Sequence, residues 1–146
     1  MDTKFSVALH ILAMISESKE TLNSQLLAES VGTNASYIRK ILALLKNAGL
    51  IRSQQGKIGI QLNKKPEEIS LLEIYYATQE VSRIKLFQAH QNPNPACPVG
   101  QHIDAAISPI FEGLEEQLEE QLANQTLDVV IKNLYASASR TRQDYS

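Results

Sequence analysis

The sequence lacks the features that mark secreted, disulfide-bonded and membrane-spanning proteins. Its 146 residues include one cysteine, Cys97, which excludes an intrachain disulfide framework. No run of about 18 apolar residues is present, so no transmembrane helix is expected. The first residues lack the cationic start, apolar stretch and cleavage site of a secretory signal. We therefore expect a cytoplasmic protein that does not engage a membrane.

The short motifs that carry common enzyme chemistry are also missing. There is no Gly-rich phosphate loop, no nucleophile elbow and no pair of histidines at metal-binding helical spacing. Cys97 and His102 could in principle form a nucleophile and a base, but five residues apart on a helix they face different directions. We expect no enzymatic activity.

The charge is divided unevenly along the chain, although the total is close to balance. The whole sequence has a net charge of −2, which by itself argues against a polyanionic partner. Residues 1–65 hold nine Lys or Arg and four Asp or Glu, a net charge of +5, so residues 66–146 carry −7. The first part suits a nucleic acid, and the second would repel it.

Three helices are predicted in the first 49 residues. Residues 4–16 are apolar on nearly every side, which predicts a helix with two packing partners. Asn23 can cap a second helix, and Gly32 can adopt the positive φ that ends it. Asn34 can cap a third helix, which Gly49 ends. The inward positions of this third helix follow the helical period and are Ile38, Ile41, Leu42, Leu45 and Ala48.

The second and third helices are joined by Gly32-Thr33, an arrangement typical of a helix-turn-helix. Residues 50–53 and 58–62 then read as two strands around a turn that contains Gly56. A helix-turn-helix followed by a β-hairpin is a winged helix, whose second helix enters the major groove of DNA. We therefore predict a mainly α fold with a winged helix-turn-helix DNA-binding domain and a small β-hairpin wing.

The second half of the chain predicts a long helix that pairs with another helix. Ser70 and Glu73 form a capping box that starts a helix over 71–78, and the three prolines of residues 88–98 predict an irregular loop. Pro109 predicts either a kink or the start of a shorter helix. A narrow apolar seam repeats at steps of three and four, which is typical of helix pairing. Its members are Ile103, Ile107, Ile110, Leu114, Leu118 and Leu122.

These elements divide the chain into four parts. The predicted parts are a winged helix-turn-helix domain over 1–78, a linker loop over 79–98, a dimerisation helix with a C-terminal helix over 99–137, and a flexible tail over 138–146. Thr126 can cap the last helix, which is expected to run from Leu127 to about Ala136. The residues beyond it are polar, so we expect them to fray.

Four segments carry a resemblance to a known family. They are residues 34–38 (Asn-Ala-Ser-Tyr-Ile), 42–50, 65–74 and the Cys97-Pro98 pair. In these segments the chain resembles the Rrf2 family of bacterial winged-helix transcription regulators, which includes an iron–sulfur-cluster regulator, a nitric-oxide sensor and a cysteine-metabolism regulator. The family implies a homodimer, in which the long helix pairs across a two-fold axis and the winged domains read a near-palindromic operator. We expect such a dimer to act as a repressor.

The family position implies DNA contacts at the start of the third helix. A helix N-terminus offers free N–H groups to phosphate, and Ser, Asn and Tyr add short donors. Arg39 stands where several members carry an acidic residue, and an arginine favours guanine, so we expect a different operator sequence. The full set of predicted DNA-binding residues is Ser24, Asn34, Ser36, Tyr37, Arg39, Lys40, Arg52 and Lys57.

Cluster-binding members carry three cysteines before the long helix, and Cys97 is the one that this chain retains. One thiolate cannot hold an iron–sulfur cluster, so we predict no cofactor. His90 and His102 lie nearby and leave a mixed Cys/His metal site as an alternative. At the start of a helix the thiol of Cys97 is expected to have a lowered pKa and to be oxidisable. The alternative is a cysteine with no sensing role.

Two functions from different classes remain open. The first is a homodimeric regulator that binds double-stranded DNA. The second is a winged-helix protein-interaction module, whose acidic half binds a protein co-regulator such as a metabolic enzyme. Arg39 and Lys40 favour the first, because a purely protein-binding helix more often shows exposed apolar residues.

Overall fold

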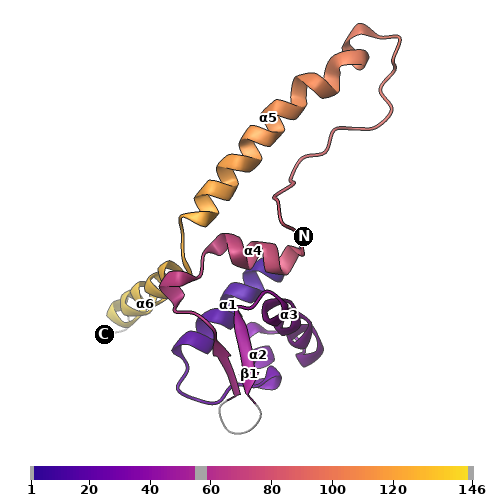
Figure 1. Cartoon of the computed structure of the whole chain (residues 1–146). Helices are drawn as coiled ribbons and strands as arrows, with labels where there is room; N and C mark the ends of the chain where they lie inside the picture. Colours follow the sequence, from indigo (N-terminus) through magenta and orange to yellow (C-terminus); the bar gives the residue numbers. More distant parts are fainter. Residues whose placement is uncertain (1, 55–58, 145–146) are drawn as a thin grey trace.

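A helical body with a β-hairpin at one end carries a long projecting helix (Figure 1). The computed structural model describes residues 2–54 and 59–144. The element order is α1 (Lys4–Glu17), α2 (Ser24–Val31), α3 (Ala35–Asn47), β1 (Ile51–Gln54), β2 (Gly59–Leu62), a 3-10 turn η1 (Pro66–Glu68), α4 (Leu71–Gln79), α5 (Pro98–Ala123) and α6 (Leu127–Asp144). The predicted mainly α winged-helix fold with a hairpin wing is confirmed.

Local capping determines where α2, α3 and α4 begin. The side chains of Asn23 and Asn34 each accept the backbone N–H three residues further on, at 2.9 Å and 2.8 Å. Before α4, Ser70 and Glu73 form the complete capping box. Each cap satisfies an N–H group that the first helical turn leaves without a partner. All three caps are as predicted.

The core is centred on α1, which contacts α2, α3, α4, α6 and β2. This helix is therefore covered on more than one side, as its apolar composition predicts. Ile38, Ile41 and Leu45 of α3 are fully buried against it. The prediction that Ala48 belongs to the same inward face is wrong, since Ala48 is exposed and forms the C-cap of α3. The helix ends there because Gly49 adopts a positive φ of 76°.

The hairpin pairs β1 with β2 in antiparallel register, with Ile51 opposite Leu62. The first strand lies one residue later than predicted, and residues 55–58, which include the predicted turn, lie outside the described residues. Gly59 begins β2 with a φ of 66°, and a Cβ atom there would lie 2.8 Å from Cγ2 of Thr21. A glycine is therefore required where the hairpin meets the loop before α2.

The helix α5 runs unbroken through Pro109, so the alternative of a shorter helix starting at that residue is wrong. Pro109 removes one helical N–H donor without ending the helix. Pro98 occupies the first turn, where no donor is needed. The helix α6 is also longer than predicted, because it continues past Ala136 to Asp144 and the supposed tail over 138–144 is helical. Residues 136–144 contain no glycine or proline that would end it.

The apolar seam of α5 is divided between two environments. Leu122 packs against the core and Leu118 is half-buried. By contrast, Ile110 is 61% exposed and Leu114 is 49% exposed. These exposed members belong to α5, which projects from the body (Figure 1). In the part of the chain that the structure describes, no helix combines the length and apolar character needed to cross a membrane.

Candidate nucleic-acid interface

The outer stripe of α3 carries the short polar side chains and the cations that the sequence assigns to DNA. Ser36, Arg39 and Lys40 are all exposed, while the opposite stripe is buried. Asn34 caps the helix and stays exposed as well. The helix N-terminus and these side chains therefore face solvent together, where a phosphate or a base edge can reach them.

Tyr37 joins this surface to the core. Its ring is half-buried against the hydrophobic cluster. Its hydroxyl oxygen lies 3.5 Å from the hydroxyl of Thr3, so the side chain bridges the start of α3 and the residue before α1. This packing fixes the first turn of α3 on the body.

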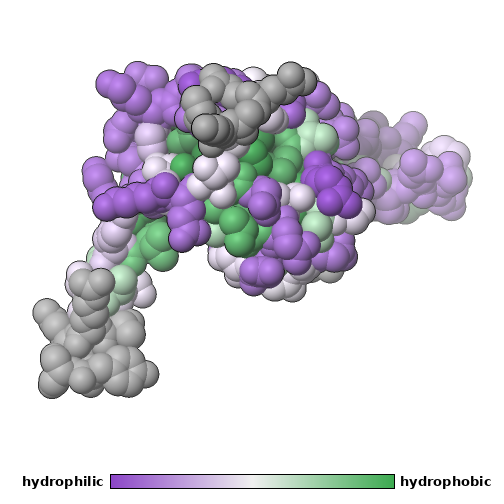
Figure 2. All heavy atoms as spheres, turned by 90° about the horizontal axis from the view of Figure 1, so that it is seen from below, coloured by the Kyte–Doolittle hydropathy of each residue, from purple (hydrophilic) through white to green (hydrophobic). Residues whose placement is uncertain are grey.

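A groove of about 250 Å³ separates α3 from the hairpin. Arg39 and Lys46 line it from α3, and Ser53 lines it from β1. Lys46 was not assigned to the interface from the sequence, although it lies two helical turns after Arg39 and thus on the same side. Seen from the hairpin end, the body of the molecule shows apolar surface bordered by hydrophilic side chains (Figure 2).

Arg52 is held by its own hairpin. Its guanidinium donates to the backbone oxygen of Leu62 and to Oδ1 of Asn63, both at 3.0 Å. A third hydrogen bond, of 2.9 Å, goes to Oε1 of Gln61. The side chain therefore links β1 to the end of β2, a role that the sequence did not reveal.

Ser24 and Lys57 are the remaining predicted DNA-binding residues. Ser24 is half-buried at the first position of α2. Lys57, at the predicted wing tip, lies outside the described residues. The structure thus groups Asn34, Ser36, Arg39 and Lys40 at the exposed start of α3.

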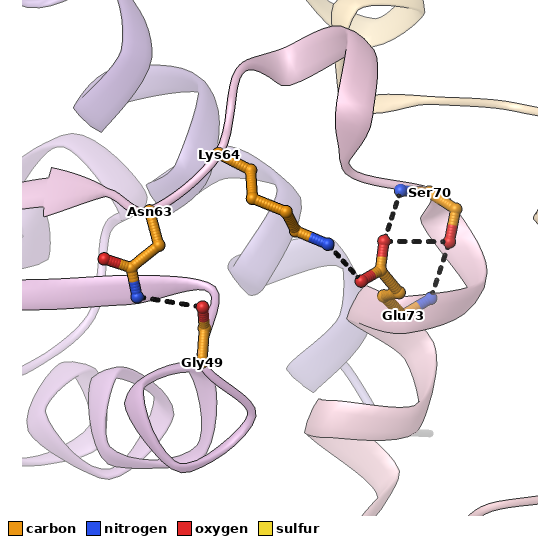
Figure 3. Close-up of polar contacts among 5 residues, drawn as sticks. All are labelled: Gly49, Asn63, Lys64, Ser70 and Glu73. Carbon is orange, nitrogen blue, oxygen red and sulfur yellow. Dashed lines mark hydrogen bonds and ion pairs between the residues drawn. The ribbon is translucent and has the colours of Figure 1, made fainter.

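Two consecutive residues after β2 brace the hairpin against α3 and α4 (Figure 3). Nδ2 of Asn63 donates to the backbone oxygen of Gly49 at 2.9 Å. Nζ of Lys64 forms an ion pair with Oε1 of Glu73 at 2.5 Å. Partial burial raises the pKa of Glu73, but hydrogen bonds from Lys64 and Ser70 outweigh it and the net pKa is lowered. These contacts set the orientation of the hairpin relative to α3.

Comparison with known proteins identifies the family of this chain. The model of the Rrf2 family, described as an iron-dependent transcriptional regulator, matches residues 1–133. The chain belongs to the Rrf2 family. A relative from Bacillus subtilis (strain 168), named as the HTH-type transcriptional regulator YwnA, is 40% identical over 135 residues, which span 92% of this chain and 99% of the relative.

Solved structures show the same Rrf2 fold. A crystal structure described as a DNA-binding protein is 38% identical, with a TM-score of 0.70, and covers 88% of this chain and 98% of that one. The structure of CymR, the global cysteine regulator of Bacillus subtilis, has a TM-score of 0.68 at 18% identity and covers 91% and 96%. At that identity CymR supports the fold alone. The chain is thus a DNA-binding transcription regulator of the Rrf2 family.

The donor atoms near Cys97 do not fit an iron–sulfur cluster, although the family description refers to iron. Clusters are usually held by about four ligands, most of them thiolates. Cys97 is the single cysteine of the chain, and it is exposed. Across residues 2–54 and 59–144, no three His, Cys, Asp or Glu side chains converge in a way that could hold a metal ion. His90 and His102 therefore do not complete a site with Cys97.

Cys97 forms the N-cap of α5. No side-chain hydrogen bond caps the helix there, but the nearby backbone N–H groups of Gly100 and Val99 favour the thiolate and lower the pKa of the thiol. An exposed thiol in such a position is more readily ionised than a free cysteine.

Proposed function

We propose that this Rrf2-family protein is a homodimeric, sequence-specific repressor that reads a near-palindromic operator with α3 in the major groove. The observation that carries the proposal is the exposed stripe of α3, where Ser36, Arg39 and Lys40 follow a capped helix N-terminus. An α-helix fits the major groove, and arginine pairs with the O6 and N7 atoms of guanine. Repression would follow from occupancy, because a bound dimer excludes other proteins from the same DNA.

The division of charge supports a defined orientation on DNA. The segment with a net charge of +5 contains α1, α2, α3 and the hairpin, and the segment with −7 contains α4, α5 and α6. Helix α5 projects away from the end of the body that carries the hairpin (Figure 1). The basic elements would face the phosphates, and the acidic arm would stay at a distance.

The exposed part of the α5 seam supports a homodimer. Ile110 and Leu114 leave an apolar strip on a projecting helix, and a second copy of α5 offers the same strip. Pairing two such helices removes this strip from water. A dimer of this kind places two copies of α3 at related half-sites of one operator.

The alternative, a protein-interaction module, is less well supported by the surface of the winged domain. Among the described residues, the large exposed apolar side chains all lie outside residues 1–78. They are Val81, Leu86, Phe87, Val99, Ile110, Leu114, Leu134 and Tyr135. Protein docking sites usually expose apolar patches, so a protein co-regulator would bind the acidic half instead.

We also infer a non-enzymatic, cytoplasmic protein, because its relative is named as a transcriptional regulator and its proposed target is DNA.

The proposal is tested by selecting DNA fragments from the host genome with the purified full chain and measuring their binding by gel shift. We expect a preferred fragment that contains an approximate inverted repeat. Affinity should fall steeply with salt, because each neutralised phosphate releases counterions. Equal binding to all fragments, or binding that does not respond to salt, would contradict the proposal.

A redox response through Cys97 is the second part of the proposed function. The position at the N-cap of α5 and the lowered pKa favour a reactive thiolate. The thiolate sulfur would then attack one oxygen of hydrogen peroxide, the O–O bond would break, and the products would be a sulfenic acid and hydroxide. We expect peroxide to weaken operator binding by the native protein but not by Cys97→Ser. An equal response of both proteins would show that Cys97 is not the sensor.

A further inference from the structure

A pocket on the arm of the molecule lies apart from the proposed DNA interface. It has a volume of about 680 Å³, and its lining residues belong to residues 83–91 and to residues 104–115 of α5. Neither α3 nor the hairpin contributes to it. Pockets that bind small molecules have volumes of roughly 300–1,000 Å³, so this one has a suitable size.

The two walls of the pocket carry opposite charges. Arg83 and Lys85 form the cationic wall, and Asp104 and Glu112 form the acidic wall on α5. None of these four side chains belongs to an ion pair within the described residues. Asp104 accepts one hydrogen bond, from the hydroxyl of Ser108 at 3.1 Å. The charges on the two walls are therefore available to a ligand.

Two stacked aromatic rings line the pocket between these walls. The ring centroids of Phe87 and Phe111 are 5.0 Å apart, and their planes are inclined by 27°. Phe87 is 43% exposed, so part of its ring remains open to contact. Together the rings offer an apolar surface beside both sets of charges.

The segment that bears the cationic wall is fixed to α5 by two carboxylates, of Glu115 and Glu119. Glu115, which is 9% exposed, accepts the backbone N–H of Leu86 at 2.5 Å and that of Phe87 at 3.3 Å. Glu119 accepts the N–H of Ile84 at 2.7 Å, and Ile84 itself is buried. The wall is thus held in place before any ligand arrives, which reduces the entropy lost on binding.

The pocket and the apolar seam use different sides of α5. On a helix of 3.6 residues per turn, Asp104 and Phe111 lie about 100° from Ile103 and Ile110. Ile107 of the seam lies about 40° from Phe111, so a helix that packs on Ile103, Ile110 and Leu114 leaves the acidic side chains of Asp104 and Glu112 uncovered.

We propose that this pocket binds a small zwitterion with an apolar side group, such as a free amino acid with an aromatic side chain. The carboxylate of the ligand binds the cationic wall, its ammonium binds the acidic wall, and its side group packs on the two phenylalanines. A simple anion or cation would satisfy one wall and face the like charges of the other. The inference concerns binding to the protein alone and does not depend on the proposed operator.

The experiment titrates L-phenylalanine into the full-length, ¹⁵N-labelled protein and follows amide chemical shifts by NMR. We expect saturable shifts at Leu86, Phe87 and neighbouring residues. Phenethylamine lacks the carboxylate and 3-phenylpropionate lacks the ammonium, so each should bind about tenfold more weakly, because each loses a charge-assisted hydrogen bond. Absence of saturable shifts at millimolar phenylalanine, or equal binding of the three compounds, would overturn the proposal.

Two variants and a matched control assign the charges. Arg83→Gln should weaken phenylalanine binding about tenfold without weakening the binding of phenethylamine, and Asp104→Asn should do the same without weakening the binding of 3-phenylpropionate. Glu116→Gln removes an exposed charge from α5 outside the pocket and should leave all affinities unchanged. If the control variant lowers the affinity as much as the pocket variants do, the binding depends on the overall charge of the protein and the proposed binding site is wrong.

Discussion

At the scale of single residues, hydrogen bonding separates the arginines of the winged domain into two roles. The guanidinium of Arg52 donates three hydrogen bonds to residues at the end of its own hairpin. Arg39 and Lys40 are exposed and belong to no ion pair in the described part of the chain. A guanidinium whose donors already have partners offers fewer to a phosphate or a base. We therefore propose that Arg39 reads sequence and that Arg52 stiffens the hairpin.

This division predicts different effects of two neighbouring substitutions. Arg39→Ala should cost about 1–3 kcal/mol of binding to the preferred operator and relax the preference at one base pair of each half-site. Lys40→Ala should weaken binding to all sequences alike. It should also reduce, by about 1, the steepness with which the logarithm of the binding constant falls with the logarithm of the salt concentration. Fluorescence anisotropy with operator and scrambled duplexes measures both effects. Arg140→Ala removes a cation from α6 and is the matched control, and a loss there equal to that of Lys40→Ala would contradict the assignment.

The thiol of Cys97 predicts a shift in a pH profile. Because the N–H groups of Gly100 and Val99 stabilise the thiolate, the pKa of this thiol lies below that of a free cysteine. The rate of alkylation by iodoacetamide should therefore reach half its maximum at a lower pH than it does for glutathione. A profile at or above that of glutathione would show that the helix N-terminus does not activate the thiol.

At the scale of elements, the orientation of the hairpin depends on contacts just after β2. Asn63 ties the chain to the end of α3, and Lys64 ties it to the start of α4 (Figure 3). The capping box of α4 therefore has two functions, since Glu73 serves both the cap and the ion pair. A substitution at this cap should therefore alter the orientation of the hairpin as well as the start of α4.

The cap gives a prediction for stability. Ser70→Ala removes the hydroxyl that accepts the N–H of Glu73 and should lower the free energy of unfolding by about 1 kcal/mol, measured by urea denaturation. Glu73→Gln keeps a capping side chain but loses the charge that Lys64 pairs with, and should cost less. Since the folded pKa of Glu73 is lowered, the contribution of its charge is present above the ordinary Glu pKa and is lost as the pH falls through the folded value. The stability difference between native protein and Glu73→Gln should thus shrink in acid, and a constant difference would contradict the ion pair's role.

Those features that depend on neighbouring residues could be predicted from the sequence. The caps at Asn23, Asn34 and Ser70 follow from side chains that reach three residues along the chain, and the inward face of α3 follows from its period. The hydrogen bonds of Arg52 and the carboxylate contacts of Glu115 could not be predicted, because they join segments that are distant in sequence. Their partners become neighbours only after the hairpin closes and residues 84–87 contact α5.

The α5 seam gives a prediction about assembly. Leu114→Glu places a charge on the exposed strip and should convert a dimer to a monomer, because burying an unpaired carboxylate is costly. Ala105→Glu introduces the same charge on the opposite, exposed side of α5 and should leave the dimer intact. Sedimentation velocity at micromolar concentrations distinguishes the two states. If Ala105→Glu also dissociates the dimer, or Leu114→Glu does not, the seam is not the interface.

At the scale of the whole molecule, the total charge is near neutral, but positive and negative charge are concentrated in different parts of the chain. The net +5 lies on the elements around α3, and the net −7 lies on the elements that include the arm. The same α5 helix bears the exposed apolar strip on one side and the lining of the proposed zwitterion pocket on another. A ligand in that pocket would thus sit beside the proposed dimer contact, where it could change the spacing of the two winged domains.

The central claim is that a dimer of this chain reads a two-fold related site on DNA with α3. Hydroxyl-radical footprinting of the purified protein on its preferred genomic fragment tests this most directly. The account predicts two protected half-sites related by an approximate inverted repeat, about one helical turn or a whole number of turns apart, with two chains bound per fragment. Arg39→Ala should weaken protection at both half-sites together. A single asymmetric protected segment, or protection spread evenly along the fragment, would contradict it.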